Sequence, residues 1–317
     1  MNFYAFLAQL IELVSALLLA PLLVGWVNQC RAWLQNRSAP PLLQVYYTLH
    51  KLFHKDVLLA HNASPLFRAA PYAIFACMAL ASAIVPTLST TLILAPAADA
   101  IALVGLFALA RVFIALAAID VGTAFGTMGS RREMFIGFLA EPALLMVFFT
   151  TSLIAHSTSL SSIVQTLART DFVIYPSLAF AGTAFLMVSL AENARVPVDN
   201  PTTHLELTMI HEAMILEYSG RHLALIEWAA SLKLFACSCL GIALFVPFGI
   251  PVTAQPSALL MASVFMLIKL IVGGFILALI ETLSAKMRIF RAPEFLGTAF
   301  LLAVLAMLVH LLLEVGK

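Results

Sequence analysis

Long apolar runs recur along the whole chain, separated by shorter polar stretches that hold most of the charged residues. A bilayer core about 30 Å thick is crossed by roughly 20 apolar residues in a helix, which is close to the length of these runs. The pattern predicts an all-α, polytopic membrane protein of about eight spans in one bundle domain over residues 1–317. The expected spans are residues 4–27, 69–94, 100–124, 134–156, 172–191, 223–246, 258–282 and 294–315.

Two of the polar stretches are long enough to form helices of their own. Residues 41–58 place leucine, valine and phenylalanine on one face and lysines on another, which is typical of an amphipathic helix on a membrane surface. Residues 203–219 are expected to form a second helix, with Glu206 and Glu217 on one face about 16 Å apart. That helix either contributes acids to an ion path or simply docks a partner protein.

The composition also indicates that lipid surrounds most of the chain, because 62% of the residues are hydrophobic, 10% are charged and the mean hydropathy is +1.03. The four cysteines, Cys30, Cys77, Cys237 and Cys239, form no CxxC pair, so neither a structural zinc nor an iron–sulfur cluster is expected in this chain. There is no phosphate-binding GxxxxGK[ST] loop, GxGxxG turn, HExxH motif or GxSxG elbow. These absences argue against a self-contained active site, and nothing predicts a nucleic-acid partner.

Basic residues are distributed unequally between the two sides of the expected membrane. Twelve fall in the loops after the first, third, fifth and seventh spans, and only Arg169 and Lys317 fall on the other side. By the positive-inside rule, both termini lie outside and the long loops lie in the cytoplasm. The twelve are Arg31, Arg37, Lys51, Lys55, Arg68, Arg131, Arg132, Arg195, Arg221, Lys286, Arg288 and Arg291.

Eight ionisable side chains fall within the expected spans, where each costs several kcal/mol unless it faces the bundle interior or a water-filled path. Some of them are near span ends, where water or headgroups can reach them, but Arg111 and Glu141 lie deeper. Buried carboxylic acids are suited to relaying protons near neutral pH. The eight are Glu12, Arg111, Asp120, Glu141, Glu227, Lys233, Lys269 and Glu281. The candidate proton path comprises Asp120 and Glu141 in the spans and Glu192, Asp199, Glu206, Glu212 and Glu217 in the loops.

Four short motifs follow one another along the polar stretches of the chain. They are Asp120-Val-Gly-Thr123, Gly129-Ser-Arg-Arg-Glu133 with Glu141-Pro142, Glu192-Asn-Ala-Arg-Val-Pro-Val-Asp199, and Glu217-Tyr-Ser-Gly220. They resemble, in this order, the cytoplasmic-loop motifs of the respiratory complex I subunit 1 family. A surface segment, Pro40-Pro-Leu-Leu-Gln-Val-Tyr-Tyr47, also looks like a helix of that family, and the resemblance runs nearly end to end. The second motif looks like the form found in the membrane subunits of energy-converting (group 4) [NiFe] hydrogenases such as formate hydrogenlyase and hydrogenase 4.

The resemblance implies a membrane foot on which a hydrophilic electron-transfer arm docks. Expected partners are the hydrogenase large and small subunits, iron–sulfur subunits and antiporter-like membrane subunits, with the NiFe centre and the iron–sulfur clusters in those partners and no cofactor in this chain. Redox chemistry in the arm would drive proton or sodium movement. Arg131, Arg132, Arg195 and Arg221 are candidates for holding the arm through guanidinium–carboxylate pairs, or else they only fix the topology.

Two other functions remain open at this point. One is a quinone-binding subunit of a complex I-like oxidoreductase, although Pro201-Thr-Thr-His204 replaces much of an acid-rich stretch in the loop that lines the quinone cavity of complex I. The other is a stand-alone secondary transporter, which is disfavoured because the chain has neither repeat symmetry nor paired broken spans. A related complex whose arm has lost its nickel ligands would contain the same kind of subunit.

Overall fold

The computed structural model describes residues 3–169, 176–199, 209–251, 256–285, 287 and 291–315, and in these ranges it contains helices and no β-strand. Each expected span has a helix in the structure, which confirms the all-α polytopic fold. Seven of these helices are long and apolar enough to cross a membrane, and the eighth, α7, is a shorter apolar helix. The eight are α1 (Phe3–Leu34), α3 (Pro65–Ile84), α4 (Ala100–Asp120), α5 (Ala124–Ala155), α7 (Pro176–Glu192), α10 (Gly220–Phe245), α11 (Pro256–Leu283) and α12 (Ala292–Val315).

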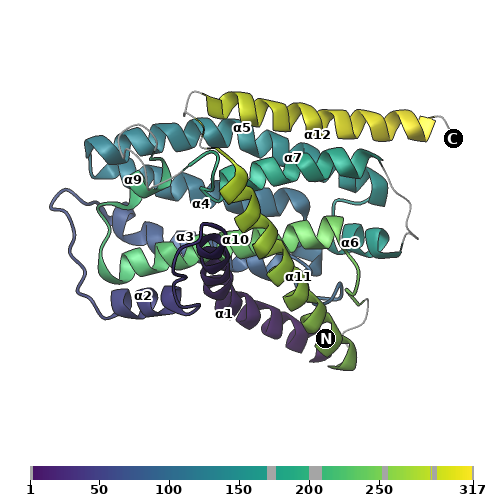
Figure 1. Cartoon of the computed structure of the whole chain (residues 1–317), viewed down its shortest axis with the longest axis horizontal. Coiled ribbons are helices and arrows are strands. Elements are labelled where there is room, and N and C mark those ends of the chain that lie inside the picture. Colours follow the sequence, from purple (N-terminus) through teal and green to yellow (C-terminus); the bar gives the residue numbers. More distant parts are fainter. Residues whose placement is uncertain are drawn as a thin grey trace.

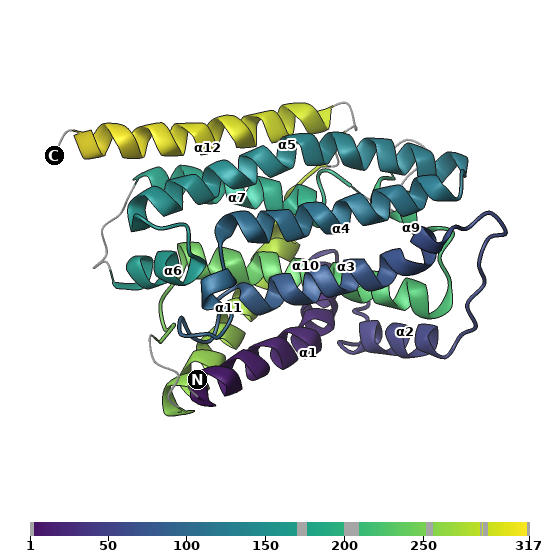
Figure 2. The ribbon, with the colours of Figure 1, turned by 180° about the vertical axis from the view of Figure 1, so that it is seen from behind.

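Most of these helices lie side by side along the long axis of the molecule (Figures 1 and 2). α4 packs between α3 and α5, α10 packs on α3, and α12 packs on α5 and α7. α1 and α11 pack against each other and cross the remaining bundle obliquely. The arrangement leaves two ends, one with the loop helices α2 (Gln44–Phe53) and α9 (His211–Ile215), and the other with both termini and α6 (Leu160–Arg169).

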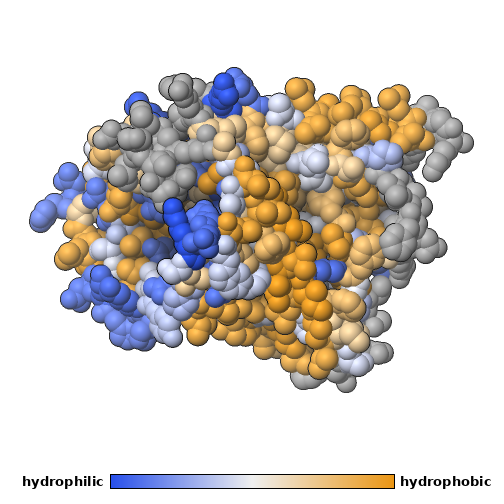
Figure 3. All heavy atoms as spheres, in the orientation of Figure 1, coloured by the Kyte–Doolittle hydropathy of each residue, from blue (hydrophilic) through white to orange (hydrophobic). Residues whose placement is uncertain are grey.

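The surface differs between these two ends. Hydrophilic residues gather at the end that carries α2 and α9, whereas the flank formed by α11 is hydrophobic (Figure 3). Leu260, Met261, Ile268, Ile271 and Val272 of α11 are all exposed. Large apolar side chains left in water would be unfavourable over such an area, so this flank faces lipid or another membrane protein.

Two helix boundaries differ from the expectation for identifiable reasons. The helix expected to reach residue 94 ends at Ile84, because Val85 adopts an extended conformation ahead of Pro86, and the residue before a proline disfavours the helical region. The helix expected from residue 134 begins at Ala124 instead, after Thr123 caps it by accepting a hydrogen bond from the Gly126 amide. The polar turns that follow Ala124 are therefore helical and not a loop.

The loop helices were predicted with mixed success. The first is confirmed as a helix, α2, although it spans only Gln44–Phe53, and its location on the membrane surface stays a prediction. The expectation of a helix over residues 203–219 is wrong where it can be checked, because α9 contains five residues and ends at Ile215. Glu206 lies outside the described residues, so its position relative to Glu217 stays a prediction. α10 then begins at Gly220, whose φ of +54° suits glycine.

Candidate functional site

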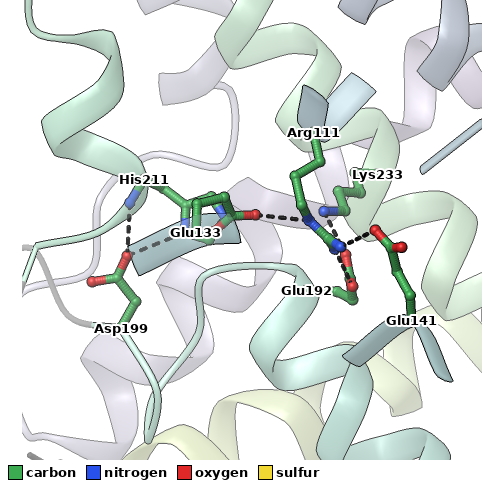
Figure 4. A network of polar contacts seen from close by, with 7 residues as sticks. All are labelled: Arg111, Glu133, Glu141, Glu192, Asp199, His211 and Lys233. Atoms are coloured by element: carbon green, nitrogen blue, oxygen red, sulfur yellow. Dashed lines mark hydrogen bonds and ion pairs between the residues drawn. The ribbon is translucent and has the colours of Figure 1, made fainter. Parts of the chain in front are cut away.

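A buried arginine in the middle of α4 organises the polar interior of the bundle. Arg111 is 6% exposed, and its guanidinium contacts three carboxylates at once. Its Nε donates to Glu133 Oε1 at 3.0 Å, Nη1 donates to Glu141, and Nη2 donates to Glu192 (Figure 4). The planar fork of donors on a guanidinium suits this arrangement, because separate nitrogens can serve acceptors on separate helices.

Helix geometry brings two of these carboxylates to the same face. Glu133 and Glu141 are eight residues apart on α5, so they lie about two turns and roughly 12 Å apart along it. Gly137 stands halfway between them, and a Cβ added there would be 2.5 Å from Arg111 Nη1. The missing side chain at Gly137 therefore provides the space that the guanidinium fills.

Glu192, at the end of α7, connects Arg111 to a second cation. Its other carboxylate oxygen pairs with Lys233 Nζ of α10 at 2.7 Å. The Glu192 side chain is 2% exposed and that of Lys233 is 15% exposed, so both charges are largely withdrawn from water. Leaving either charge unpaired at such a depth would be strongly unfavourable, and the pair thus fixes α7 against α10.

His211 carries the network from the helices to the loop end. Its Nε2 lies 3.2 Å from Glu133 Oε2, its Nδ1 lies 3.2 Å from Asp199 Oδ2, and its backbone N–H donates to the same Asp199 oxygen at 3.1 Å. Burial by itself would lower the pKa of His211, but Glu133 and Asp199 outweigh it and raise the pKa to about 9. His211 is therefore a cation at neutral pH and bridges two carboxylates.

The seven residues drawn in Figure 4 form one continuous chain of ion pairs from the loop end to the middle of the bundle. Three are cations, with His211 protonated, and four are carboxylates. Glu141 is the most accessible of the carboxylates, with a side chain 33% exposed. A proton gained or lost at Glu141 changes how many carboxylates compete for Arg111. We call Arg111, Glu133, Glu141, Glu192, Asp199, His211 and Lys233 the central network.

The candidate proton-path residues separate into groups. Glu141, Glu192 and Asp199 lie in the central network. Asp120 does not, because its Oδ2 accepts a hydrogen bond from the Ser64 amide at 2.8 Å, beside the start of α3. Glu212 and Glu217 are exposed at the loop end, and among the described residues neither one is paired with a central-network side chain.

The four candidate docking arginines also differ. Arg131 and Arg221 are exposed. Arg132 donates to the Met209 carbonyl at 3.0 Å and so helps to hold the segment before α9. Arg195 pairs with Glu281 of α11 at 3.1 Å, and Arg31 approaches the same carboxylate at 3.6 Å. Glu281 of α11 is therefore shared by the loop after α7, through Arg195, and by α1, through Arg31.

Sequence reasoning did not assign roles to Glu133, His211 or Lys233. Lys233 was noted as a charge inside a span, and Glu133 was noted only as part of a motif. The signal that was available for Glu133 is its spacing of eight residues from Glu141. No comparable signal exists for His211, because its contacts depend on how the loop between α7 and α10 folds back.

The fold and the buried network define a multi-pass membrane protein of helical-bundle type with a polar interior. The chain belongs to the NADH dehydrogenase family, that of complex I subunit 1, whose model matches residues 7–312. Two curated relatives from Escherichia coli (strain K12) match nearly end to end. Formate hydrogenlyase subunit 4 is 32% identical over 300 residues, covering 94% of this chain and 97% of the relative. Hydrogenase-4 component C is 31% identical over 304 residues, covering 96% and 95%.

A solved structure has the same fold. A chain of the membrane-bound sulfane sulfur reductase, an archaeal respiratory membrane complex, superimposes with a TM-score of 0.83 at 19% identity, covering 96% of this chain and 99% of that one. At this identity the similarity establishes the fold alone.

Proposed function

We propose that this chain is the membrane-anchor subunit of an energy-converting hydrogenase or formate hydrogenlyase-type complex in a bacterial or archaeal inner membrane. It docks a hydrophilic electron-transfer arm on the end that carries α2 and α9, with both termini on the opposite side of the membrane. It couples redox chemistry in that arm to proton or sodium movement. The two curated relatives, named as a formate hydrogenlyase subunit and a hydrogenase-4 component, support this choice.

The observation that carries the proposal is the continuity of the central network. Asp199 and His211 lie at the loop end, whereas Glu141 and Lys233 lie near the midpoints of α5 and α10. A change of charge or position at His211 acts directly on Glu133, which shares Arg111 with Glu141 and Glu192. Charges in a medium of low dielectric interact strongly over such distances, so an event at the loop shifts proton affinity deeper in the bundle.

Arm docking is assigned to the exposed basic residues at the loop end. Within the described ranges neither Arg131 nor Arg221 forms an ion pair of the kind that occupies Arg195, and both present guanidinium groups to carboxylates on a partner. The hydrogenase large and small subunits and the iron–sulfur subunits are the proposed partners on this side, and antiporter-like subunits are proposed within the membrane. The NiFe and iron–sulfur centres are proposed to reside in those partners.

The proposal is tested by purifying the tagged chain in mild detergent and identifying the polypeptides, nickel and iron that accompany it. Recovery of a nickel-containing hydrogenase arm with iron–sulfur and antiporter-like subunits supports it. An arm that retains iron–sulfur clusters but lacks nickel identifies a related complex without hydrogenase chemistry. A chain that purifies alone and transports a substrate contradicts the proposal.

One observation favours the quinone-binding alternative. A cavity of about 660 Å³ lies between α7, α10 and α11, lined mainly by apolar side chains such as Phe185, Phe245 and Leu277, with Arg195 among its polar residues. Such a cavity has the size and lining of a site for an isoprenoid ligand. Quinone-dependent activity of the purified complex, blocked by a bulky residue at Gly241 in the cavity wall, would establish this alternative.

A further inference from the structure

Glu12 is a buried acid that lies outside the central network, in the half of the bundle that holds the chain termini. It is nine residues from the start of α1, or about 14 Å along the helix, and is 1% exposed. Both groups that bond to its Oε1 belong to Thr87. The Thr87 amide donates at 2.6 Å and the Thr87 hydroxyl at 2.5 Å.

Nothing in the described ranges neutralises a charge on Glu12. No lysine, arginine or histidine there forms an ion pair with it, in contrast to Glu133, Glu192 and Glu281. Its Oε2 is buried and accepts no hydrogen bond there, although the Leu88 amide faces the same carboxyl group. The titratable group that faces it from α10 is the Cys239 thiol.

A carboxylate buried without a counter-charge costs far more than a typical polar contact returns, so this group must bind a proton or a metal cation. The surroundings favour the proton. The polar neighbours that meet Oε1 are an N–H and an O–H, which present hydrogens to the carboxyl group. A hard cation needs several oxygen ligands instead.

Thr87 also provides access to this carboxyl group. Together with Lys269 and Cys239, it lines a cavity of about 10 Å³, which is near the space that one water molecule requires. The Lys269 ammonium donates to the carbonyls of Val246 and Phe248 beside this cavity. A hydroxyl can donate to one group while accepting from another, so Thr87 can link the cavity to Glu12.

We propose that Glu12 is a proton-binding site in the half of the membrane opposite the α2 and α9 loops, loaded and unloaded through Thr87 and the cavity beside Lys269. In the loading step, a hydronium ion in the cavity gives a proton to the Thr87 oxygen and becomes water, as the hydroxyl proton of Thr87 moves to Glu12. Thr87 is unchanged at the end of the step, and the carboxylate has become a carboxylic acid. The site stands without the proposed function, but its use in coupled ion movement rests on that function.

Dicyclohexylcarbodiimide tests the site, because it reacts with protonated carboxyl groups in apolar surroundings. Native membranes that contain the full chain in its complex are treated with the reagent in KCl or in NaCl, and the modified residues are mapped by mass spectrometry. Label at Glu12, falling as the pH is raised and equal in the two salts, is the expected result. Absence of label at Glu12 in membranes where other carboxyls react overturns the proposal, as does protection by NaCl but not by KCl.

Thr87→Val tests the access route without removing the acid, because valine keeps the shape of threonine but has no hydroxyl. We expect Glu12 still to be labelled in this variant. When the reagent is added at successive times after a jump to alkaline pH, the extent of new labelling at Glu12 should fall more slowly with time than in the wild type. An unchanged rate assigns access to another route and overturns the role of Thr87. Labelling requires no turnover, so normal labelling with no coupled ion transport would count against the proposed function and not against this site.

Discussion

Gly137 lies directly against the side chain of Arg111, since a Cβ added at Gly137 would stand 2.5 Å from Nη1 and 2.8 Å from Cδ of that arginine. Glu133 and Glu141 flank the glycine at equal spacing on α5, and both pair with the guanidinium. One face of α5 thus combines a gap with an acid on either side of it. The arginine is held by the shape of the helix surface as well as by charge.

Gly137→Ala is expected to displace the Arg111 guanidinium and to weaken the central network. Overpacking of this kind costs typically about 1–3 kcal/mol. We expect a lower midpoint of thermal unfolding for the detergent-purified complex and a loss of coupled activity. Gly105→Ala on α4 is the matched control, because a Cβ there meets nothing within 4 Å. If the two variants unfold at the same temperature, the close approach of Gly137 to Arg111 does not constrain the protein.

Arg111→Met is expected to be more damaging, because it leaves Glu133, Glu141 and Glu192 facing one another without their shared cation. Breaking a buried ion pair by removing one partner costs about 3–5 kcal/mol. The amount of folded chain, measured by fluorescence-detected size-exclusion chromatography after heating, should fall sharply.

Arg111→Lys separates charge from geometry in the same assay. Lysine keeps the positive charge but lacks the planar fork that reaches three acceptors, so an intermediate loss is expected. Equal stability of the Lys and wild-type proteins would show that charge alone holds the three carboxylates. Wild-type stability of the Met variant would contradict the assignment of Arg111 as the organising cation.

The helices were predictable because their cause is local. Each span is a run of apolar residues of bilayer length, and α2 has a regular apolar stripe, so neither required knowledge of the tertiary structure. The early end of α3 at Ile84 is also local in origin, since Pro86 was visible in the sequence. The predicted boundary at residue 94 was wrong because the apolar residues continue past Pro86. The proline nevertheless restricts the backbone of Val85, and the helix ends before it.

The central network was only partly predictable, because it depends on contacts between distant segments. Glu141, Glu192 and Asp199 were found as acids in unusual places, and Arg111 as a charge deep within a span. That Arg111 serves three acids at once depends on the packing of α4 against α5 and α7. The role of His211 was missed because a helix expected over residues 203–219 would have left it on an ordinary solvated surface.

His211 should make the loop end sensitive to alkaline pH. Burial lowers its pKa, but Glu133 and Asp199 raise it to about 9 from an ordinary value of 6.5. A pKa raised on folding stabilises the protein fully below pH 6.5, and the contribution declines as the pH rises and is lost above about 9. By this linkage, the protonated histidine contributes at most about 3 kcal/mol near neutral pH.

His211→Gln provides the comparison that isolates this contribution. The midpoint of thermal unfolding of the purified complex is measured from pH 6 to pH 10 for both proteins. We expect the wild type to be more stable at low pH and the difference to disappear by about pH 10. A difference that stays constant over the whole range would mean that His211 contributes by packing and not by its charge.

Glu141→Gln tests the use of the central network in ion movement. Glutamine keeps the size of the side chain and an oxygen that accepts from Arg111, but it cannot take up and release a proton. Assembly should therefore be intact, while redox-driven proton uptake into membrane vesicles falls by about tenfold or more, as expected for loss of a proton-transferring group. Glu294→Gln, at an exposed position in the first turn of α12 and outside both the central network and the candidate proton path, is the control and should transport normally. Unchanged transport by Glu141→Gln would exclude Glu141 from the path and leave the buried Glu133 and Glu192 as the remaining candidates.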